Sequence, residues 1–314
     1  MRKHILKKIS LAVLIFTVLS NAFVPRTYAA YSDNPNVVYY DLSRLVYKGS
    51  TEMNNKLSSK FKVIDFVDVN QNQYHPMGTL INGKLSELKK TGFKAAAVVI
   101  EESKKLFIVF AGSSDIYDWN TAGKTVTEKT PGQEYQAQLY TNYIYKKFPK
   151  YQGYNWYFTG HSLGGWLAVK DYLDIRSANW VNDASKFKYG GAIGKSAISG
   201  VYTFNPLPIS YDNVNLSQWN ANQSGTYNSY IKNLYIENEW LNGVADMYPS
   251  KMAYFGTKGS INTGIQHYSY FYIPLGNIQA DLASYYVQNS KSKNRDYKAV
   301  TDGHSISNFS NYVH

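Results

Sequence analysis

The segment Thr159-Gly160-His161-Ser162-Leu163-Gly164-Gly165 contains the pattern Gly-x-Ser-x-Gly, between an apolar strand-like stretch and an apolar helix-like stretch. In this pattern the serine occupies a sharp, strained turn from a strand into a helix, and glycines two positions away leave room for both neighbours. The turn lifts the hydroxyl of Ser162 out of the sheet and makes it a candidate nucleophile. It also directs the N–H of Leu163, at the helix start, toward the place where an oxyanion would form.

The residues around this turn alternate between strand-like and helix-like patterns. Short apolar runs typical of strands occupy residues 93–100, 106–110, 156–159, 201–204 and 234–236. Apolar residues spaced by three and four predict an amphipathic helix over residues 133–148, and a second helix is expected over residues 163–173. This alternation predicts an α/β protein with helices on the faces of one sheet. The polar stretch 211–230, rich in Asn, Ser and Gln, is expected to be a loop or an insertion.

A second motif, Phe110-Ala111-Gly112-Ser113, directly follows the apolar run 106–110, and Trp119 lies shortly after it. In hydrolases with a strand–turn–helix nucleophile, the second oxyanion donor is a backbone N–H at the end of such a strand. Ser113 is therefore the candidate for that donor, together with Leu163.

The first 30 residues indicate secretion. They carry five of the positive charges and no acid, so the net charge of +11 falls to +6 for the rest of the chain. A basic start, an apolar run over residues 9–19 and small residues around Thr27-Tyr28-Ala29 predict a signal peptide over residues 1–29 and a single domain over residues 30–314. A membrane anchor is disfavoured because the apolar run is shorter than the roughly 20 residues of a span, and no other transmembrane segment is expected.

Composition excludes several other classes of protein. The chain has no cysteine, which rules out disulfides, thiolate metal sites and a cysteine nucleophile. No metal or cofactor motif is present, and none is expected. The lysine pairs at 89–90, 104–105 and 146–147 are interpreted as solvated surface, with weak attraction to an anionic wall or lipid surface as the alternative. No nucleic-acid-binding pattern is visible.

The two motifs together resemble the class 3 lipase family, the fungal-lipase-like branch of the α/β-hydrolases. Gly160 to Gly165 match the family pattern throughout, and Phe110, Gly112, Ser113 and Trp119 match the upstream motif. Ala111 stands where the family usually has arginine, so the supporting role of that arginine is absent or reassigned. The resemblance runs from about Lys94 to His304. It implies an α/β-hydrolase fold with a mostly parallel central sheet and helices on both faces, here in a secreted protein that suits a bacterium.

In that fold the triad follows the order serine, acid, histidine along the chain. His304, in the polar turn Asp302-Gly303-His304, is favoured as the base. His161 is expected to support the turn beside Ser162. The remaining histidines after the nucleophile are expected to play a structural role (His267, in a Tyr-rich run) or to be terminal (His314).

The acid is expected after the strand over residues 234–236. The family commonly places Asn-Asp there, and Asn238-Glu239 matches with glutamate in place of aspartate. Glu239 is favoured over Asp246, which follows Gly243 and could serve if the loop folds back. Glu237 is expected to face the other side of the strand.

The resemblance implies hydrolysis of a carboxylic ester, with a glyceride or phospholipid as the substrate class. The polar stretch 116–131, where the family's lid often lies, favours small or soluble esters instead. Two alternatives stay open. One is another serine acyl-transfer enzyme, such as a peptidase or an acyltransferase, and the other is a non-catalytic binding protein on a hydrolase scaffold.

Overall fold

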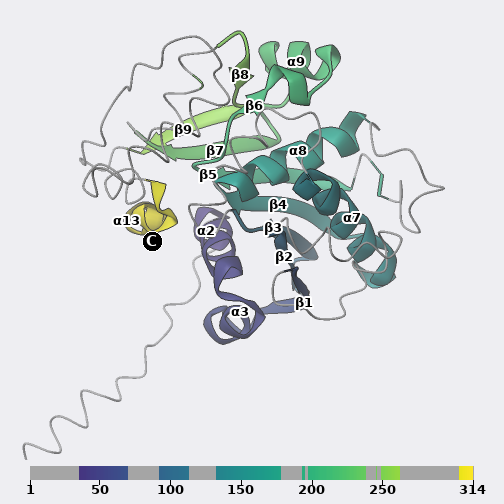
Figure 1. Cartoon of the computed structure of the whole chain (residues 1–314). Coiled ribbons are helices and arrows are strands. Elements are labelled where there is room, and N and C mark those ends of the chain that lie inside the picture. Colours follow the sequence, from purple (N-terminus) through teal and green to yellow (C-terminus); the bar gives the residue numbers. More distant parts are fainter. Residues whose placement is uncertain are drawn as a thin grey trace, which may run out of the picture. The chain divides into compact units, whose positions relative to one another are not determined.

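A seven-stranded sheet in the order β1-β2-β3-β4-β5-β7-β9 forms the centre of the computed structural model (Figure 1). The structure describes residues 35–69, 92–112, 132–177, 193–194, 197–237, 245, 249–261 and 304–313. All of them belong to one unit, Asp33–His314. The predicted signal peptide, the lid-like stretch, Ser113, Glu239, Asp246, His267 and His314 lie outside the described residues.

The sheet is mostly parallel. Its strands are β1 (Phe61–Asp68), β2 (Lys94–Ile100), β3 (Lys105–Phe110), β4 (Asn155–His161), β5 (Ile198–Phe204), β7 (Ile231–Ile236) and β9 (Thr257–Ile261). The pairs β1–β2 and β2–β3 are antiparallel, whereas β3–β4, β4–β5, β5–β7 and β7–β9 are parallel. A separate two-stranded sheet pairs β6 (Ile209–Ser210) with β8 (Met252–Ala253). The five strands expected from the sequence all lie in the central sheet.

One face of the sheet is covered by α7 (Gly132–Lys147) and α8 (Leu163–Ser177), as Figure 1 shows. Along β4 the side chains that point to this face are Trp156 and Phe158, which belong to the main hydrophobic core with residues of both helices. The two expected helices are thus confirmed. Within the described ranges, none of the helices is long and apolar enough to cross a bilayer.

The opposite face is covered by α2 (Pro35–Leu45), which the sequence analysis did not anticipate. Tyr39 of α2 stacks on Tyr202 with ring centroids 4.0 Å apart and meets Phe107 edge-on. On the same face Ser43 Oγ lies 2.9 Å from Thr159 Oγ1 in a buried hydrogen bond. Helices therefore cover both faces, which confirms the expected α/β-hydrolase class. After α2 the chain continues through η1 (Val46–Lys48) and α3 (Ser50–Lys56) to β1.

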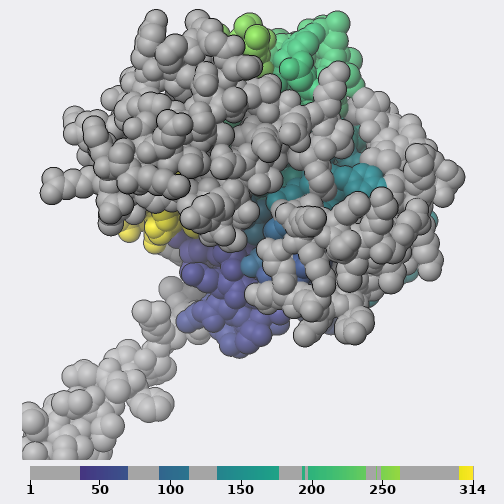
Figure 2. All heavy atoms as spheres, viewed as in Figure 1, coloured from purple at the N-terminus to yellow at the C-terminus, as the bar shows by residue number. Residues whose placement is uncertain are grey.

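The segment that follows His304 also packs on this second face. It comprises η4 (Ile306–Phe309) and α13 (Ser310–Val313), and both contact α2. Figures 1 and 2 show this yellow segment against the purple α2. Phe309 is fully buried and meets Phe204, the last residue of β5, edge-on at a centroid distance of 5.2 Å. A residue near the end of the chain thus packs against the end of a central strand.

The polar stretch 211–230, expected to be a loop or an insertion, is partly helical, and its last residues, 224–230, form turns. It contains η3 (Tyr211–Asn213) and α9 (Leu216–Gln223). Asn215 caps α9 with its side chain, which accepts from the backbone N–H of Gln218 at 2.8 Å, and the Gln218 side chain accepts in return from the N–H of Asn215 at 2.9 Å. This reciprocal cap satisfies two N–H groups that the helix leaves open, so a polar sequence forms a stable helix start.

Charged side chains are buried where α7 meets α8. The ammonium of Lys170 lies 2.7 Å from Glu134 and 2.6 Å from Asp174. The next residue, Asp171, accepts a hydrogen bond of 2.6 Å from Thr141. Burial raises the pKa of Asp171 from 3.8 to about 8 and that of Glu134 to about 7. We therefore expect Asp171 to carry a proton at neutral pH, because burial outweighs the Thr141 hydrogen bond and the nearby Lys170 charge.

Replacement of Asp171 by asparagine tests this protonation. The folded state holds the Asp171 proton up to about pH 8, whereas an unfolded chain releases it near pH 3.8, so this group's contribution to stability is lost as pH rises between these values. Asparagine is neutral at every pH. We therefore expect the free energy of unfolding of Asp171→Asn, measured with urea at several pH values, to fall less steeply with rising pH than that of the wild type.

The matched control is Asp174→Asn, one turn further along α8. This change removes a carboxylate that accepts two hydrogen bonds from Lys170 and leaves a buried ammonium poorly compensated. We expect a loss of about 3 kcal/mol at neutral pH. Parallel pH profiles for the wild type and Asp171→Asn would show that Asp171 is ionised in the folded protein.

Candidate active site

Ser162 lies in the turn between β4 and α8 with a left-handed backbone, φ 59°. Few residues other than glycine adopt this conformation, and it is stable only where the surrounding structure enforces it. Here the enforcing contacts are hydrogen bonds on both sides of the turn. The N–H of Ser162 donates to the carbonyl of Phe204 at 3.1 Å, and its own carbonyl accepts from Gly165 and Trp166 at the start of α8. The predicted strand–turn–helix geometry is confirmed.

The glycines of the turn are required by space. A Cβ on Gly160 would collide with the backbone of Gly164, and a Cβ on Gly164 would collide with the carbonyl oxygen of Phe110 at the end of β3. Rigid backbone stands at both places, so a side chain could not be accommodated by a rotamer change. The helix start is thus pressed against the ends of β3 and β4. Leu163 is the first residue of α8, and a helix leaves the N–H of its first residue without an internal acceptor.

The chain leaves β3 directly beside the serine. A Cβ on Gly112 would lie 2.5 Å from the Tyr47 hydroxyl oxygen, 2.6 Å from the His161 carbonyl oxygen and 3.1 Å from Cβ of Ser162. The N–H of Gly112 donates to the Tyr47 hydroxyl at 2.9 Å. Ser113, the expected second oxyanion donor, is the next residue and lies outside the described part of the chain.

His304 is brought to the same turn from a distant part of the chain. It is buried, with 4% of its surface exposed, and its ring centroid lies 4.8 Å from that of His161. Nε2 of His161 is 2.7 Å from the backbone carbonyl oxygen of His304. The structure thus places His304 against the immediate neighbour of Ser162, and Phe309 anchors the following residues on β5.

His161 supports the turn, as its position in the motif suggested. Burial, with a smaller contribution from His304, lowers its pKa well below the ordinary 6.5, so the ring is neutral at pH 7. A carbonyl oxygen only accepts, so Nε2 carries the hydrogen and donates it to His304. Nδ1 then accepts from the Tyr47 hydroxyl, 3.1 Å away. Nothing in the sequence distinguished Tyr47 from the other 29 tyrosines.

Neither candidate acid is among the described residues, but the strand before them is. In the parallel register His161 stands opposite Phe204, and Phe204 stands opposite Leu234, so β4, β5 and β7 end along one edge of the sheet. Asn205 holds the end of β7 at this edge, because its side-chain oxygen accepts from the N–H of Ile236 at 2.8 Å. Glu239 and Asp246 follow this point in the sequence but are outside the described residues.

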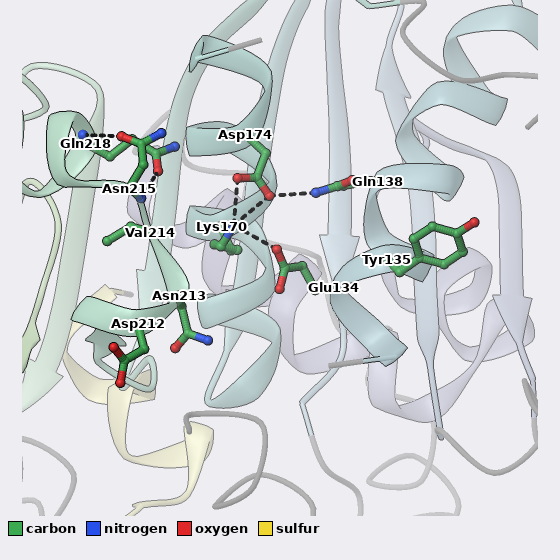
Figure 3. Close-up of a pocket in the computed structure, with 10 residues that line it drawn as sticks. All are labelled: Glu134, Tyr135, Gln138, Lys170, Asp174, Asp212, Asn213, Val214, Asn215 and Gln218. Carbon is green, nitrogen blue, oxygen red and sulfur yellow. Dashed lines mark hydrogen bonds and ion pairs between the residues drawn. The ribbon is translucent and has the colours of Figure 1, made fainter. Parts of the chain in front are cut away.

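A separate pocket of about 320 Å³ lies between α7, α8 and the η3–α9 segment (Figure 3). Lys170 stands between Glu134 and Asp174 on one side of it, and residues 212–215 with Gln218 line the other. Its charged groups are the ion-paired cluster described above. Lys170 lies two turns along α8 from Leu163, so we assign the pocket no part in the chemistry at Ser162.

The sequence matches no protein-family model and no curated protein. Among solved structures, the chain is similar to the triacylglyceride lipase of Rhizomucor miehei, with a TM-score of 0.48 and 17% identity over 73% of this chain and 79% of that one. Lipase II from Rhizopus niveus gives 0.46 and 12%, covering 72% of this chain and 79% of its own. Lip2 lipase from Yarrowia lipolytica gives 0.44 and 10%, covering 72% and 76%. These are similarities of fold at low identity.

Proposed function

We propose that this protein is a serine hydrolase of carboxylic esters, with Ser162 as the nucleophile. One observation carries the proposal: Ser162 adopts a left-handed backbone at a strand-to-helix turn, and His304 is hydrogen-bonded through its backbone to the adjacent His161. A strained serine at the start of a helix, with a distant histidine drawn to the same turn, is the arrangement that activated serine nucleophiles need.

The proposed reaction proceeds through an acyl-enzyme. His304 takes the proton of the Ser162 hydroxyl while the oxygen attacks the ester carbonyl carbon. Backbone N–H groups of Leu163 and Ser113 stabilise the negative charge on the carbonyl oxygen. The protonated His304 returns its proton to the departing alcohol, and water then attacks the acyl-enzyme by the same two steps. Glu239 or Asp246 orients the imidazole and stabilises its positive charge.

The substrate class and the location are part of the same proposal. We propose a glyceride, a phospholipid or a smaller soluble ester as the substrate, with the polar stretch 116–131 favouring the smaller esters. The basic, then apolar, first 29 residues support secretion, and the mature net charge of +6 is compatible with weak attraction to anionic cell walls or lipid surfaces.

Labelling with a fluorophosphonate tests the nucleophile. We expect the intact mass of the mature protein to increase by one adduct, and Ser162→Ala to show no adduct and to lose roughly 10⁴-fold or more of its ester hydrolysis. Ser224→Ala, which changes an exposed serine after α9, is the matched control and should label like the wild type.

Other outcomes would separate the alternatives. Retained activity in Ser162→Ala would refute the site. No adduct on folded wild-type protein would favour the non-catalytic binding protein. A labelled enzyme that prefers amide substrates, or transfers the acyl group to an acceptor other than water, would favour the peptidase or acyltransferase.

A second experiment separates the two candidate acids. Glu239→Gln and Asp246→Asn each remove one negative charge with little change in shape. We expect Glu239→Gln to lower kcat by roughly 10⁴-fold, and Asp246→Asn to leave it within about threefold. The reverse pattern would assign Asp246, and normal rates in both variants would exclude both residues.

A further inference from the structure

Tyr47, His161, Gly112 and His304 form one continuous chain of hydrogen bonds around the nucleophile turn. The Gly112 N–H donates to the Tyr47 hydroxyl at 2.9 Å, this hydroxyl lies 3.1 Å from Nδ1 of His161, and Nε2 of His161 lies 2.7 Å from the His304 carbonyl oxygen. We propose that Tyr47 and His161 are positioning residues that hold the oxyanion-side turn at Gly112 and the backbone of His304 in register with Ser162. This inference rests on the proposed function.

The hydrogens in this chain are directed by the two groups at its ends. The backbone N–H of Gly112 only donates, so the Tyr47 oxygen accepts there and its own hydrogen faces two acceptors of His161, Nδ1 at 3.1 Å and the carbonyl oxygen at 3.3 Å. At the other end the carbonyl of His304 only accepts, so Nε2 of His161 donates. Each nitrogen of the neutral ring thus has a hydrogen-bond partner. Because His161 is buried, a proton added to Nδ1 would cost desolvation and oppose the Tyr47 hydrogen.

Tyr47 is itself held in place on its backbone side. Lys94, at the start of β2, forms an ion pair of 2.9 Å with Asp68, and its ammonium lies 3.5 Å from the Tyr47 carbonyl oxygen. The carbonyl of the same Lys94 accepts from the N–H of Ala111 at 3.0 Å. Lys94 therefore contacts both Tyr47, in η1, and Ala111, which precedes Gly112 after β3.

The two ends of the hydrogen-bond chain, Gly112 and the backbone of His304, each adjoin a group with a proposed catalytic role. Gly112 directly precedes Ser113, the proposed oxyanion donor, and the His304 carbonyl fixes the Cα from which the proposed general base projects. If the Tyr47 hydroxyl is lost, the Gly112 peptide and the His161 ring each lose a partner. Both the proposed donor and the proposed base can then shift.

Tyr47→Phe is the direct test, with a short-chain p-nitrophenyl ester as the substrate. We expect kcat to fall on the order of tenfold to a hundredfold, since small misplacements of reacting groups cost that much, with KM unchanged within about twofold. The rate constant of fluorophosphonate labelling should fall in parallel. The matched control is Tyr172→Phe, because that buried hydroxyl on α8 has no hydrogen-bond partner in the described part of the structure. It should leave kcat unchanged.

Two replacements of His161 each remove one of the two hydrogen bonds that its ring forms. Glutamine keeps a donor near the position of Nε2 and so can still reach the His304 carbonyl, whereas asparagine keeps an acceptor near Nδ1 for Tyr47. We expect both to lower kcat, and Tyr47→Phe to lower kcat by a smaller factor in His161→Gln than in the wild type, because its contact with the ring is already absent and only its contact with Gly112 remains to be lost. Urea unfolding of every variant shows whether it is folded under the assay conditions.

Nitrogen-15 NMR of labelled histidines tests the hydrogen-bond chain by a measurement that does not depend on enzyme activity. We expect the His161 ring to be the neutral Nε2–H tautomer at pH 7, to stay neutral to well below the ordinary histidine pKa, and to change its Nδ1 shift in Tyr47→Phe. The Nδ1–H tautomer would overturn the inference, as would equal kcat values for Tyr47→Phe and Tyr172→Phe. Wild-type protein that neither labels nor hydrolyses esters would instead reject the serine-hydrolase proposal, and the tautomer would still report on the chain.

Discussion

The close approach of three backbone segments at the Ser162 turn is the constraint on which the rest of the site depends. The start of α8 lies so near the ends of β3 and β4 that any side chain on Gly160 or Gly164 would strike backbone atoms. This contact holds Ser162 in its left-handed conformation and sets the first N–H groups of α8 at the carboxyl edge of the sheet. The parallel register then brings the ends of β5 and β7 to the same edge.

Hydrogen bonds of neutral groups join Tyr47, Gly112, His161 and His304 at this edge. The charged cluster of Lys170, Glu134 and Asp174 lies between α7 and α8, away from the turn, and the ion pair of Lys94 with Asp68 lies behind the backbone of Tyr47. Around Ser162 the partners are backbone carbonyls, backbone N–H groups, a tyrosine hydroxyl and an uncharged imidazole. The described groups thus add little fixed charge around Ser162, so in the proposed mechanism the oxyanion donors and the triad acid would dominate the field at the serine.

The sequence predicted the parts of this protein that depend on local pattern. The five apolar strands, the two helices α7 and α8 and the turn at Ser162 follow from periodicity and from glycine spacing. The polar composition of 211–230 does not show its helix, because α9 depends on the spacing of two residues: Asn215 and Gln218 form the cap at which it begins. Tyr47 could not be found, because its role comes from contacts with residues far away in the chain. The two candidate acids remain predictions for the same reason.

The anchoring of His304 has a consequence for how activity is acquired during folding. The site joins Tyr47, Gly112, Ser162 and His304, and the last of these is held by the packing of Phe309 on β5 and by contacts of α13 with α2. Contacts between segments so far apart in sequence close late and slowly. A partly folded chain, even one with a complete β3–β4–α8 unit and a well-formed serine turn, would still lack His304, the proposed base. In the proposed mechanism, catalytic competence therefore requires the folded chain from α2 to α13.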